Sequence, residues 1–375
     1  MLTAAEQLRY ARHLVLPGFG AVAQLRLKTA RVLIVGAGGL GSPAALYLAA
    51  AGIGQLGIAD DDTVAVSNLQ RQILHGTGML AMPKVASAHS RLSDLNPTIA
   101  IETYRLRLDA SNIDALVAAY DVIVDGTDNF ATRYLLTDAS ARHTRPLVYG
   151  SIYQFDGQVT VFYPAAGGPC YRCLYPTPPP ANLVPDCATG GVLGVLPGVI
   201  GTIQATEVIK IVTGIGTTLR GRLLLYDALT MRVDEIAIAR NPACPLCGDA
   251  PHEPPSLPIA QLDESEHVMP GADLTPAQVA ARAAETDAPL LLDVREEYEW
   301  NLGHLPGAIR IAIGELPQRV GELDPHRETI VYCRSGARSA QAADFLRQSG
   351  FRQVWNMTGG TLRWADDIDP TMPKY

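Results

Sequence analysis

The six cysteines of the chain fall into two C-x-x-C pairs and two single residues. Cys170 pairs with Cys173, and Cys244 pairs with Cys247. In a reducing compartment such pairs more often bind metal or do redox work than form structural disulfides. Four thiolates match the ligand set of a tetrahedral structural Zn²⁺ site. We therefore predict zinc at these four residues, with a redox dithiol or inert buried cysteines as the alternatives.

Cys333 opens a short loop, Cys333-Arg-Ser-Gly-Ala-Arg338, directly after an apolar run at 329–332. Backbone N–H groups in such a loop point inward as an anion nest, and Arg338 is placed to close it. That setting favours a thiolate and a bound persulfide anion. Cysteine phosphatases use C-x5-R, whereas the spacing here is C-x4-R, a ring too small for phosphate and suited to sulfur. We predict sulfur carriage by Cys333.

Cys187 stands alone in the glycine-rich stretch 186–191, which has few strong secondary-structure signals. Flexibility and exposure suit a nucleophile, so we expect a part in acyl or sulfur transfer. A small buried residue is the alternative.

A glycine-rich turn, Gly36-x-Gly38-x-x-Gly41, separates a short apolar strand at 31–35 from a helix that runs to about Ala51. Such a turn lets a phosphate meet free N–H groups at a helix N-terminus. Asp60 ends the next strand, about 20 residues on, where a carboxylate binds ribose hydroxyls. These features alone are typical of an NAD dehydrogenase.

The following segments favour a triphosphate instead of a dinucleotide. Arg71 and Lys84 supply positive charge beside the ribose position, which suits a triphosphate that is being broken. Asp128 follows a later strand, at the edge where open α/β sheets bind ligands. A carboxylate there suits Mg²⁺, which prefers one or two carboxylates together with phosphate oxygens.

Strands and helices alternate along the chain, which predicts two α/β domains. Residues 1–249 predict a Rossmann-like nucleotide-binding domain with a mixed sheet, because strands at 158–163 and 223–226 follow the parallel part. Residues 1–30 are expected to be helical. The stretch 250–271 begins Pro-rich and predicts a linker. Residues 272–375 predict a second, smaller α/β domain.

Composition sets the outer limits on function. The 375 residues carry a net charge of −8, which argues against a general nucleic-acid or membrane binder. No apolar run is long enough to cross a membrane, and the first ten residues lack the apolar core of a signal peptide. A cytoplasmic protein is expected.

Several of these motifs together resemble the ThiF/MoeB family of ubiquitin-activating-enzyme-like adenylyltransferases. The stretches that carry the resemblance are 9–12 (RYAR), 35–41 (VGAGGLG), 67–72 (SNLQRQ), 83–84 (PK), 127–129 (TDN) and 194–201 (GVLPGVIG). The resemblance implies homodimers that use ATP to adenylate the C-terminal glycine of a ubiquitin-like sulfur carrier, with Zn²⁺ on the four paired cysteines. The implied ligands of ATP and Mg²⁺ are Gly39, Asp60, Ser67, Asn68, Arg71, Lys84, Asp128 and Asn129. Arg12 is implied to reach the ATP of the neighbouring subunit.

Residues 272–372 resemble a rhodanese domain, through the Cys333 loop, Asp293-Val-Arg-Glu296 and Gly303-His-Leu-Pro-Gly-Ala308. The whole chain is therefore similar to fusions of a MoeB-type enzyme with a rhodanese. The resemblance implies adenylation of a carrier ending in Gly-Gly, with sulfur from an upstream persulfide or thiosulfate donor. The product would be a C-terminal thiocarboxylate.

Two questions stay open at this stage. One alternative function is an activating enzyme that conjugates a ubiquitin-like modifier through a thioester on Cys187. Another is a non-catalytic ATP-bound scaffold or sensor, against which the presence of Arg12, Arg71, Lys84 and Cys333 argues. The carrier and its route (molybdopterin, thiamine, cysteine, siderophore or tRNA thiolation) are not specified by the residues.

Overall fold

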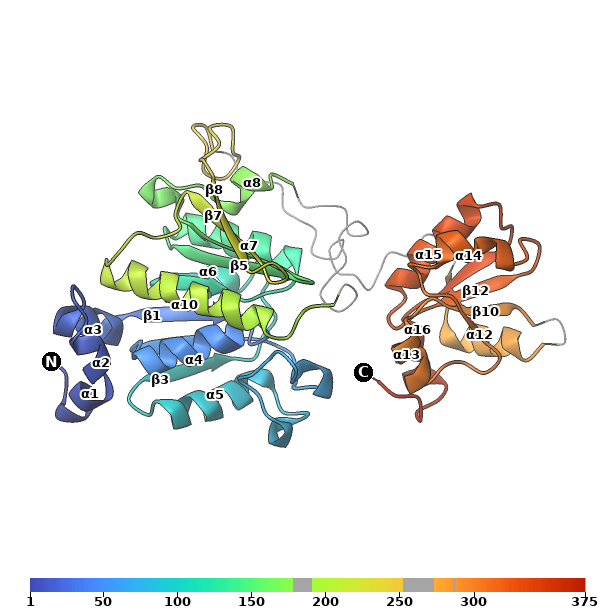
Figure 1. The fold of residues 1–375 in the computed structure, drawn as a ribbon, viewed down its shortest axis with the longest axis horizontal. Coiled ribbons are helices and arrows are strands. Elements are labelled where there is room, and N and C mark those ends of the chain that lie inside the picture. The colour runs from blue at the N-terminus through green and yellow to red at the C-terminus, as the bar shows by residue number, and fades with distance from the viewer. Residues whose placement is uncertain (178–190, 252–272, 286–287, 375) are drawn as a thin grey trace. The chain divides into compact units, whose positions relative to one another are not determined.

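The computed structural model describes residues 1–177, 191–251, 273–285 and 288–374, and these form two compact units (Figure 1). Cys187 and nearly all of the predicted linker at 250–271 lie outside the described residues, so both stay predictions. None of the helices in the described part of the chain is long and apolar enough to cross a membrane.

An eight-stranded mixed sheet forms the centre of the first unit, in the order β3-β2-β1-β4-β5-β6-β7-β8. The five strands from β3 to β5 run parallel, and β6, β7 and β8 extend the sheet antiparallel. The strand bounds are β1 Arg31–Val35, β2 Gln55–Ala59, β3 Ala100–Tyr104, β4 Val122–Asp125, β5 Leu147–Tyr153, β6 Asp156–Phe162, β7 Arg222–Asp227 and β8 Arg232–Ala237. The predicted mixed sheet is confirmed.

Helices cover both faces of this sheet (Figure 1). Successive residues of β1 alternate between the two cores: Val32 and Ile34 pack with α3, α4, α5 and α10, whereas Leu33 and Val35 pack with α6, α7 and α8. A strand buried on both faces needs a continuous apolar run, which is why 31–35 carries one. The helix bounds are α1 Ala4–Arg9, α2 Ala11–Leu14, α3 Gly20–Thr29, α4 Gly41–Ala51, α5 Lys84–Leu95, α6 Ile113–Ala118, α7 Phe130–Arg142, α8 Tyr171–Leu174 and α10 Leu196–Thr213.

The N-terminal helix expected over 1–30 is three helices instead of one. Pro17 cannot continue a helix, and Gly18 adopts a positive φ of 77° that breaks the chain direction before α3. Thr3 caps α1 through a capping box with Glu6.

The second unit is a five-stranded parallel sheet in the order β11-β10-β12-β13-β9. Its strands are β9 Asp273–Leu274, β10 Leu290–Asp293, β11 Ile309–Arg310, β12 Thr329–Tyr332 and β13 Val354–Met357. Its helices are α12 Pro276–Ala283, α13 Glu297–Leu302, α14 Leu316–Arg319, α15 Ala337–Gln348 and α16 Gly360–Asp367. Apolar residues on the two sides of β10 and β12 form separate cores, one with α14 and α15 and one with α12 and α16. Cys333 follows the central strand β12.

Candidate functional sites

The glycine-rich turn lies between β1 and α4, at the point where the strand order reverses from β1 to β4. Open α/β sheets bind ligands outside the carboxyl ends of strands at this switch point. Gly36 has a φ of 91°, and a Cβ there would lie 2.6 Å from the Gly126 carbonyl oxygen. A side chain at Gly41 would meet the Gly36 carbonyl oxygen at 1.8 Å. The turns after β1 and β4 therefore touch each other through glycine alone.

Predicted ligands from the segment after β2 converge on this turn. The Asp60 carboxylate accepts a hydrogen bond from the Ala37 N–H at 2.8 Å, which places it directly beneath the loop. A Cβ on Gly39 would lie 3.2 Å from Pro197 and 3.8 Å from Cδ of Arg71. Gly39, Asp60 and Arg71 thus lie around the same turn.

Lys84 begins α5 and is buried, and its Nζ lies 2.7 Å from a carboxylate oxygen of Asp62. Partial burial opposes ionisation of Asp62, but the hydrogen bond and the charge of Lys84 hold the pKa of this carboxyl below its usual range. The pair holds the lysine side chain in place. Asp62 was missed in the sequence, although it lies only two residues from Asp60.

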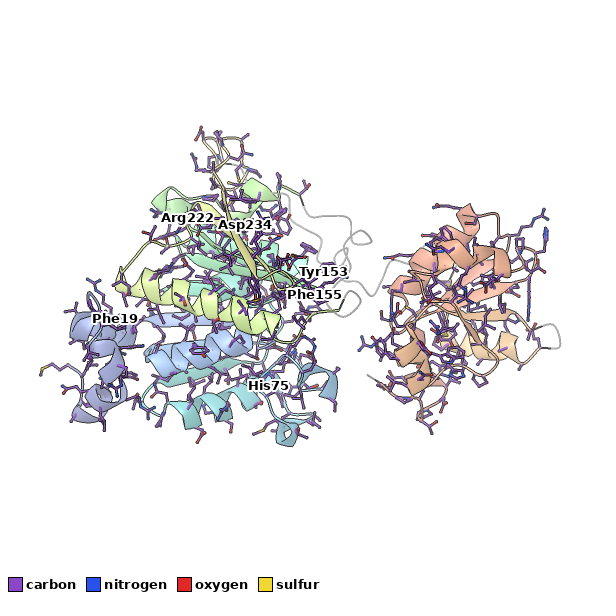
Figure 2. All side chains as sticks on the ribbon, in the orientation of Figure 1. Phe19, His75, Tyr153, Phe155, Arg222 and Asp234 are labelled. Carbon is purple, nitrogen blue, oxygen red and sulfur yellow. The ribbon has the colours of Figure 1, made fainter. Side chains whose placement is uncertain are left out.

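His75 is a second missed residue beside the nucleotide turn (Figure 2). Its ring spans from the Ser87 hydroxyl, at 2.9 Å from Nδ1, to the Ala37 carbonyl oxygen, at 2.8 Å from Nε2. Burial lowers the pKa of His75 and the charge of Lys84 lowers it further, so the ring is neutral at pH 7. It holds the turn by a hydrogen bond.

The remaining predicted nucleotide ligands are on the surface at the same edge. Asp128 and Asn129 are exposed after β4, and the Asn129 side chain caps α7 by accepting the Thr132 N–H at 2.9 Å. Ser67 is exposed, and its carbonyl oxygen accepts a hydrogen bond from Arg71 at 3.0 Å. Asn68 accepts the Ala65 N–H at 3.1 Å. The Asn68 and Asn129 side chains are thus held by local contacts, and Ser67, Asp128 and Asn129 are exposed to solvent.

Arg12 does not join the site of its own chain. It is exposed on α2, which packs at the C-terminal end of α4 through His13, Gln24 and the Ala51 carbonyl. The glycine-rich turn lies at the other end of that 11-residue helix, about 16 Å away along its axis. An arginine side chain does not span that distance.

All four paired cysteines meet in one cluster, with their sulfur atoms within 4.8 Å of one another. The closest sulfur–sulfur distances run from 3.4 to 3.8 Å. Four Zn–S bonds of ~2.3 Å in a tetrahedron require sulfur–sulfur edges of about 3.8 Å. Hydrogen bonds from Cys170, Cys247 and the Asn241 N–H hold the pKa of Cys173 below its usual range, so the cluster holds a thiolate. The cluster fits zinc.

Substitution of one of these ligands tests the zinc assignment. We expect Cys173→Ser to lose the bound zinc, measured by elemental analysis of the purified protein, and to lower Tm by about 10 °C. The ion would tie α8 to the segment at 244–247, so its loss frees two distant parts of the chain. Cys333→Ser is the matched control and should keep both values. Full zinc content with an unchanged Tm in Cys173→Ser would contradict the assignment.

Cys333 is fully buried at the end of β12, and its loop holds it with uncharged donors. Its Sγ accepts the Gly336 N–H at 3.1 Å and lies 3.4 Å from the Ser339 hydroxyl. Arg338 lies in the first turn of α15, and both of its terminal nitrogens bind the Glu299 carboxylate at 2.7 Å. The sequence did not identify Ser339 or Glu299 as residues of this site, because neither belongs to a recognisable motif.

Each of the two units matches a known protein family. The ThiF family model matches residues 10–246, and the rhodanese-like domain model matches residues 275–367. The chain belongs to the ThiF family. This ThiF-family chain is 42% identical to the probable adenylyltransferase/sulfurtransferase MoeZ of Mycobacterium tuberculosis, over 100% of this chain and 96% of the relative. It is 38% identical to the adenylyltransferase and sulfurtransferase MOCS3 of Arabidopsis thaliana, over 98% of this chain and 85% of that protein.

Two further likenesses concern the first unit. A sulfur carrier protein adenylyltransferase of Thermus thermophilus is 50% identical over 66% of this chain and 93% of its own length. The E. coli MccB structure solved with ATP matches 64% of this chain and 74% of its own with a TM-score of 0.57 at 21% identity, a likeness of fold alone. The expected enzyme class is confirmed: this ThiF-family chain is an adenylyltransferase and sulfurtransferase. Membership of the family also supports the use of ATP.

Proposed function

We propose that the enzyme adenylates the C-terminal glycine of a ubiquitin-like sulfur carrier ending in Gly-Gly and then converts it to a thiocarboxylate with sulfur carried by Cys333. The observation that carries this proposal is the presence, on one chain, of a ThiF-type nucleotide site and a buried cysteine in a rhodanese loop. The printed name of the Thermus thermophilus relative, a sulfur carrier protein adenylyltransferase, supports the choice of substrate.

In the first half-reaction a carrier carboxylate attacks the α-phosphate of ATP, and pyrophosphate leaves. A carboxylate is already deprotonated at pH 7, so no general base is needed. Arg71 and Lys84 neutralise the growing negative charge on the phosphates, and Asp128 would hold Mg²⁺. Asp60, Ser67, Asn68 and Asn129 surround the sugar, and the turn at Gly39 admits the phosphates.

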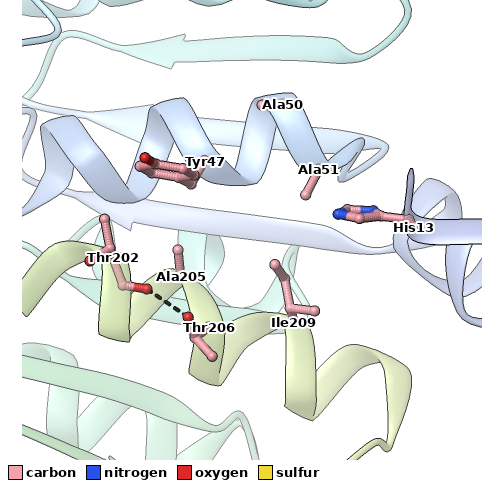
Figure 3. A pocket seen from close by; sticks show the side chains of 8 residues that line it. All are labelled: His13, Tyr47, Ala50, Ala51, Thr202, Ala205, Thr206 and Ile209. Atoms are coloured by element: carbon pink, nitrogen blue, oxygen red, sulfur yellow. Dashed lines mark hydrogen bonds between the residues drawn. The ribbon is translucent and has the colours of Figure 1, made fainter. Parts of the chain in front are cut away.

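Arg12 completes the nucleotide site of a second copy in a homodimer. α4 and α10 lie side by side, and together with α2 they line a groove of about 420 Å³ (Figure 3). Tyr47 is 59% exposed beside this groove, and Leu8, Val15 and Leu16 are exposed apolar residues on α1 and just after α2. A two-fold axis across α4 and α10 would bring the α2 end of one copy to the glycine-rich turn of the other.

An exposed apolar surface near the same sheet edge suits the folded part of the carrier. Tyr153 and Phe155 lie together at the β5–β6 turn (Figure 2), and Leu229, Met231 and Val233 are exposed at the β7–β8 turn. A hydrogen bond of 3.0 Å from the Ala228 N–H to the Phe155 carbonyl oxygen joins the two turns. Exposed apolar patches of this kind mark protein–protein contacts.

In the second half-reaction the outer sulfur of a Cys333 persulfide attacks the carbonyl carbon of the acyl-adenylate, and AMP leaves. The product is an acyl disulfide between carrier and Cys333. A thiolate, which we assign to Cys187, then attacks the Cys333 sulfur, so that the carrier leaves as a thiocarboxylate and a Cys187–Cys333 disulfide remains. An external thiol reduces that disulfide, and a persulfide or thiosulfate donor reloads Cys333. This chemistry needs reduced thiols, so we propose a cytoplasmic setting.

Tethering gives a physical reason for joining the two activities. An acyl-adenylate hydrolyses readily, and a sulfur donor on the same chain has a raised effective concentration that favours transfer over water. A thioester-forming conjugating enzyme would have no use for the Cys333 loop.

The proposal is tested by ATP–pyrophosphate exchange against a panel of purified carriers ending in Gly-Gly. We expect exchange with at least one carrier, followed by a thiosulfate-dependent mass increase of that carrier equal to replacement of oxygen by sulfur. A carrier with its last glycine removed is the control. Exchange with none of the carriers would exclude adenylation, and exchange without the mass increase would exclude sulfur transfer.

A further inference from the structure

The anion-binding loop after β12 solvates the cysteine sulfur with neutral groups. The Gly336 N–H and the Ser339 hydroxyl contact Sγ of Cys333, and the Ser339 hydroxyl is itself held by Oδ1 of Asn356 at 2.6 Å. The Ser339 hydroxyl is fixed in a buried setting, because Ser339 and Asn356 are almost inaccessible to solvent. The charge of the loop therefore depends on its arginines.

Arg338, the arginine that ends the motif, is neutralised by a carboxylate from another element. Glu299 on α13 binds both terminal nitrogens of Arg338 at 2.7 Å, with the carboxylate side chain 2% exposed and the arginine 13% exposed. The same carboxylate accepts the Glu296 N–H at 3.0 Å and so caps α13. A bidentate pair of this kind has a fixed geometry, so both its position and its charge are set.

We propose that Glu299 is a positioning and specificity residue for the sulfur transfer at Cys333. By cancelling the charge of Arg338 it leaves a loop suited to the single charge of a persulfide, and it weakens the binding of doubly charged oxyanions such as thiosulfate, sulfate and hydrogen phosphate. This inference rests on the proposed function in that it takes Cys333 as the sulfur carrier. It adds the class of donor that the loop favours, an organic persulfide.

Several other charged groups lie around the loop. Arg334 lies within the loop and is partly exposed, Arg363 on α16 is paired with Asp367 at 3.1 Å, and Asp273 lies beside Asn356. Asp293 is bound to Arg295 at 2.6 Å, and both are fully buried behind β10. On α13, the Glu299 carboxylate binds both terminal nitrogens of Arg338. Tyr298 lies close to Arg338 and Arg334.

Formation of the Cys333 persulfide from thiosulfate can be measured without the sulfur carrier protein. The thiolate attacks the sulfane sulfur, the S–S bond of thiosulfate breaks, and sulfite leaves with the bonding electron pair, so a cysteine persulfide forms without an added oxidant. Cyanide then takes the sulfane sulfur as thiocyanate and regenerates the thiolate. The same loading by glutathione persulfide releases glutathione.

The test compares Glu299→Gln, Arg338→Gln and the double variant in the full chain. Glu299→Gln leaves Arg338 charged, so we expect KM for thiosulfate to fall by about tenfold, inhibition by phosphate to strengthen, and alkylation of Cys333 by iodoacetamide at pH 6 to be about threefold faster. KM for glutathione persulfide should change by less than about twofold. Arg338→Gln leaves a buried carboxylate, so KM for thiosulfate should rise.

The double variant separates charge from structure. If Glu299 acts through the charge of Arg338, the two single variants shift KM for thiosulfate in opposite directions and the double variant returns close to wild type. A shift of both single variants in the same direction, or an unchanged KM and alkylation profile in Glu299→Gln, would overturn the inference. If circular dichroism shows that Glu299→Gln does not fold, the other two variants still test the inference. KM for thiosulfate should rise in Arg338→Gln and lie close to the wild-type value in the double variant. A wild-type chain that takes no sulfur from either donor would defeat the proposed function itself.

Discussion

Replacement of Cys333 by alanine is expected to lower thiocarboxylate formation by roughly three orders of magnitude or more while ATP–pyrophosphate exchange continues at the wild-type rate. In the proposed mechanism the thiol is the sulfur carrier, and neither water nor a hydroxyl at that position can hold sulfane sulfur. Its loop lies in the second unit and shares no residue with the nucleotide site, so adenylation does not depend on it. Mass spectrometry of the carrier and radiolabelled pyrophosphate exchange measure the two activities in one preparation.

Cys187→Ala tests whether Cys187 releases the thiocarboxylate from Cys333. We expect it to keep both exchange and persulfide loading of Cys333, but to accumulate the acyl disulfide between carrier and Cys333 in place of the free thiocarboxylate. Full thiocarboxylate yield without an added thiol in Cys187→Ala would remove Cys187 from the mechanism. Thiocarboxylate formation by Cys333→Ala at more than a trace would show that sulfur reaches the adenylate by another route.

A mixed dimer of Arg12→Ala and Lys84→Ala subunits is expected to recover exchange that each variant alone has lost. Each single variant removes a positive charge that stabilises the transition state, so we expect a loss of about 100-fold or more. In the mixed dimer the subunit with intact Lys84 receives an intact Arg12 from the other subunit. One of its two nucleotide sites is therefore complete, and activity should reach about half of the wild-type value per dimer.

The mixed dimer would remain inactive if each Arg12 acted on the nucleotide site of its own chain. Every site of the mixed dimer would then lack one of the two charges, and no activity would return.

Tyr47→Arg places a charge on the groove between α4 and α10. We expect this variant to be a monomer, measured by sedimentation, and to lack ATP–pyrophosphate exchange. Leu302→Arg, on α13 of the second unit, is the matched control because Leu302 is an exposed apolar residue far along the chain from that groove.

Local motifs made much of the molecule predictable from its sequence. The strand predicted at 31–35 matches β1 residue for residue, and the apolar run at 329–332 is strand β12. In each case the apolar run or the start signal lies within the element itself. The edge strand β8 was not predicted, because both of its faces are largely exposed and its residues show no clear alternation. Continuous helix over 1–30 conflicts with the local signal of Pro17 and Gly18, and the segment forms three helices.

The residues that orient the catalytic groups were beyond sequence reasoning. His75 reaches the Ala37 carbonyl across 38 positions, and Glu299 reaches Arg338 across 39. A hydrogen bond between such distant positions leaves no periodic trace in the chain. Each exists only because parallel strands place their carboxyl ends at one edge of a sheet.

The types and spacing of its residues by themselves predicted the chemistry of this chain: four thiolates for a metal, a glycine-rich turn for phosphate and a C-x4-R loop for sulfur. Those choices lie within short segments, where backbone geometry and side-chain chemistry are set by immediate neighbours. The tertiary structure alone decided that Arg12 lies about 16 Å from the nucleotide turn of its own chain, at the far end of α4. It also decided that Arg338 is neutralised by Glu299, because the fold brings this residue of α13 to the first turn of α15.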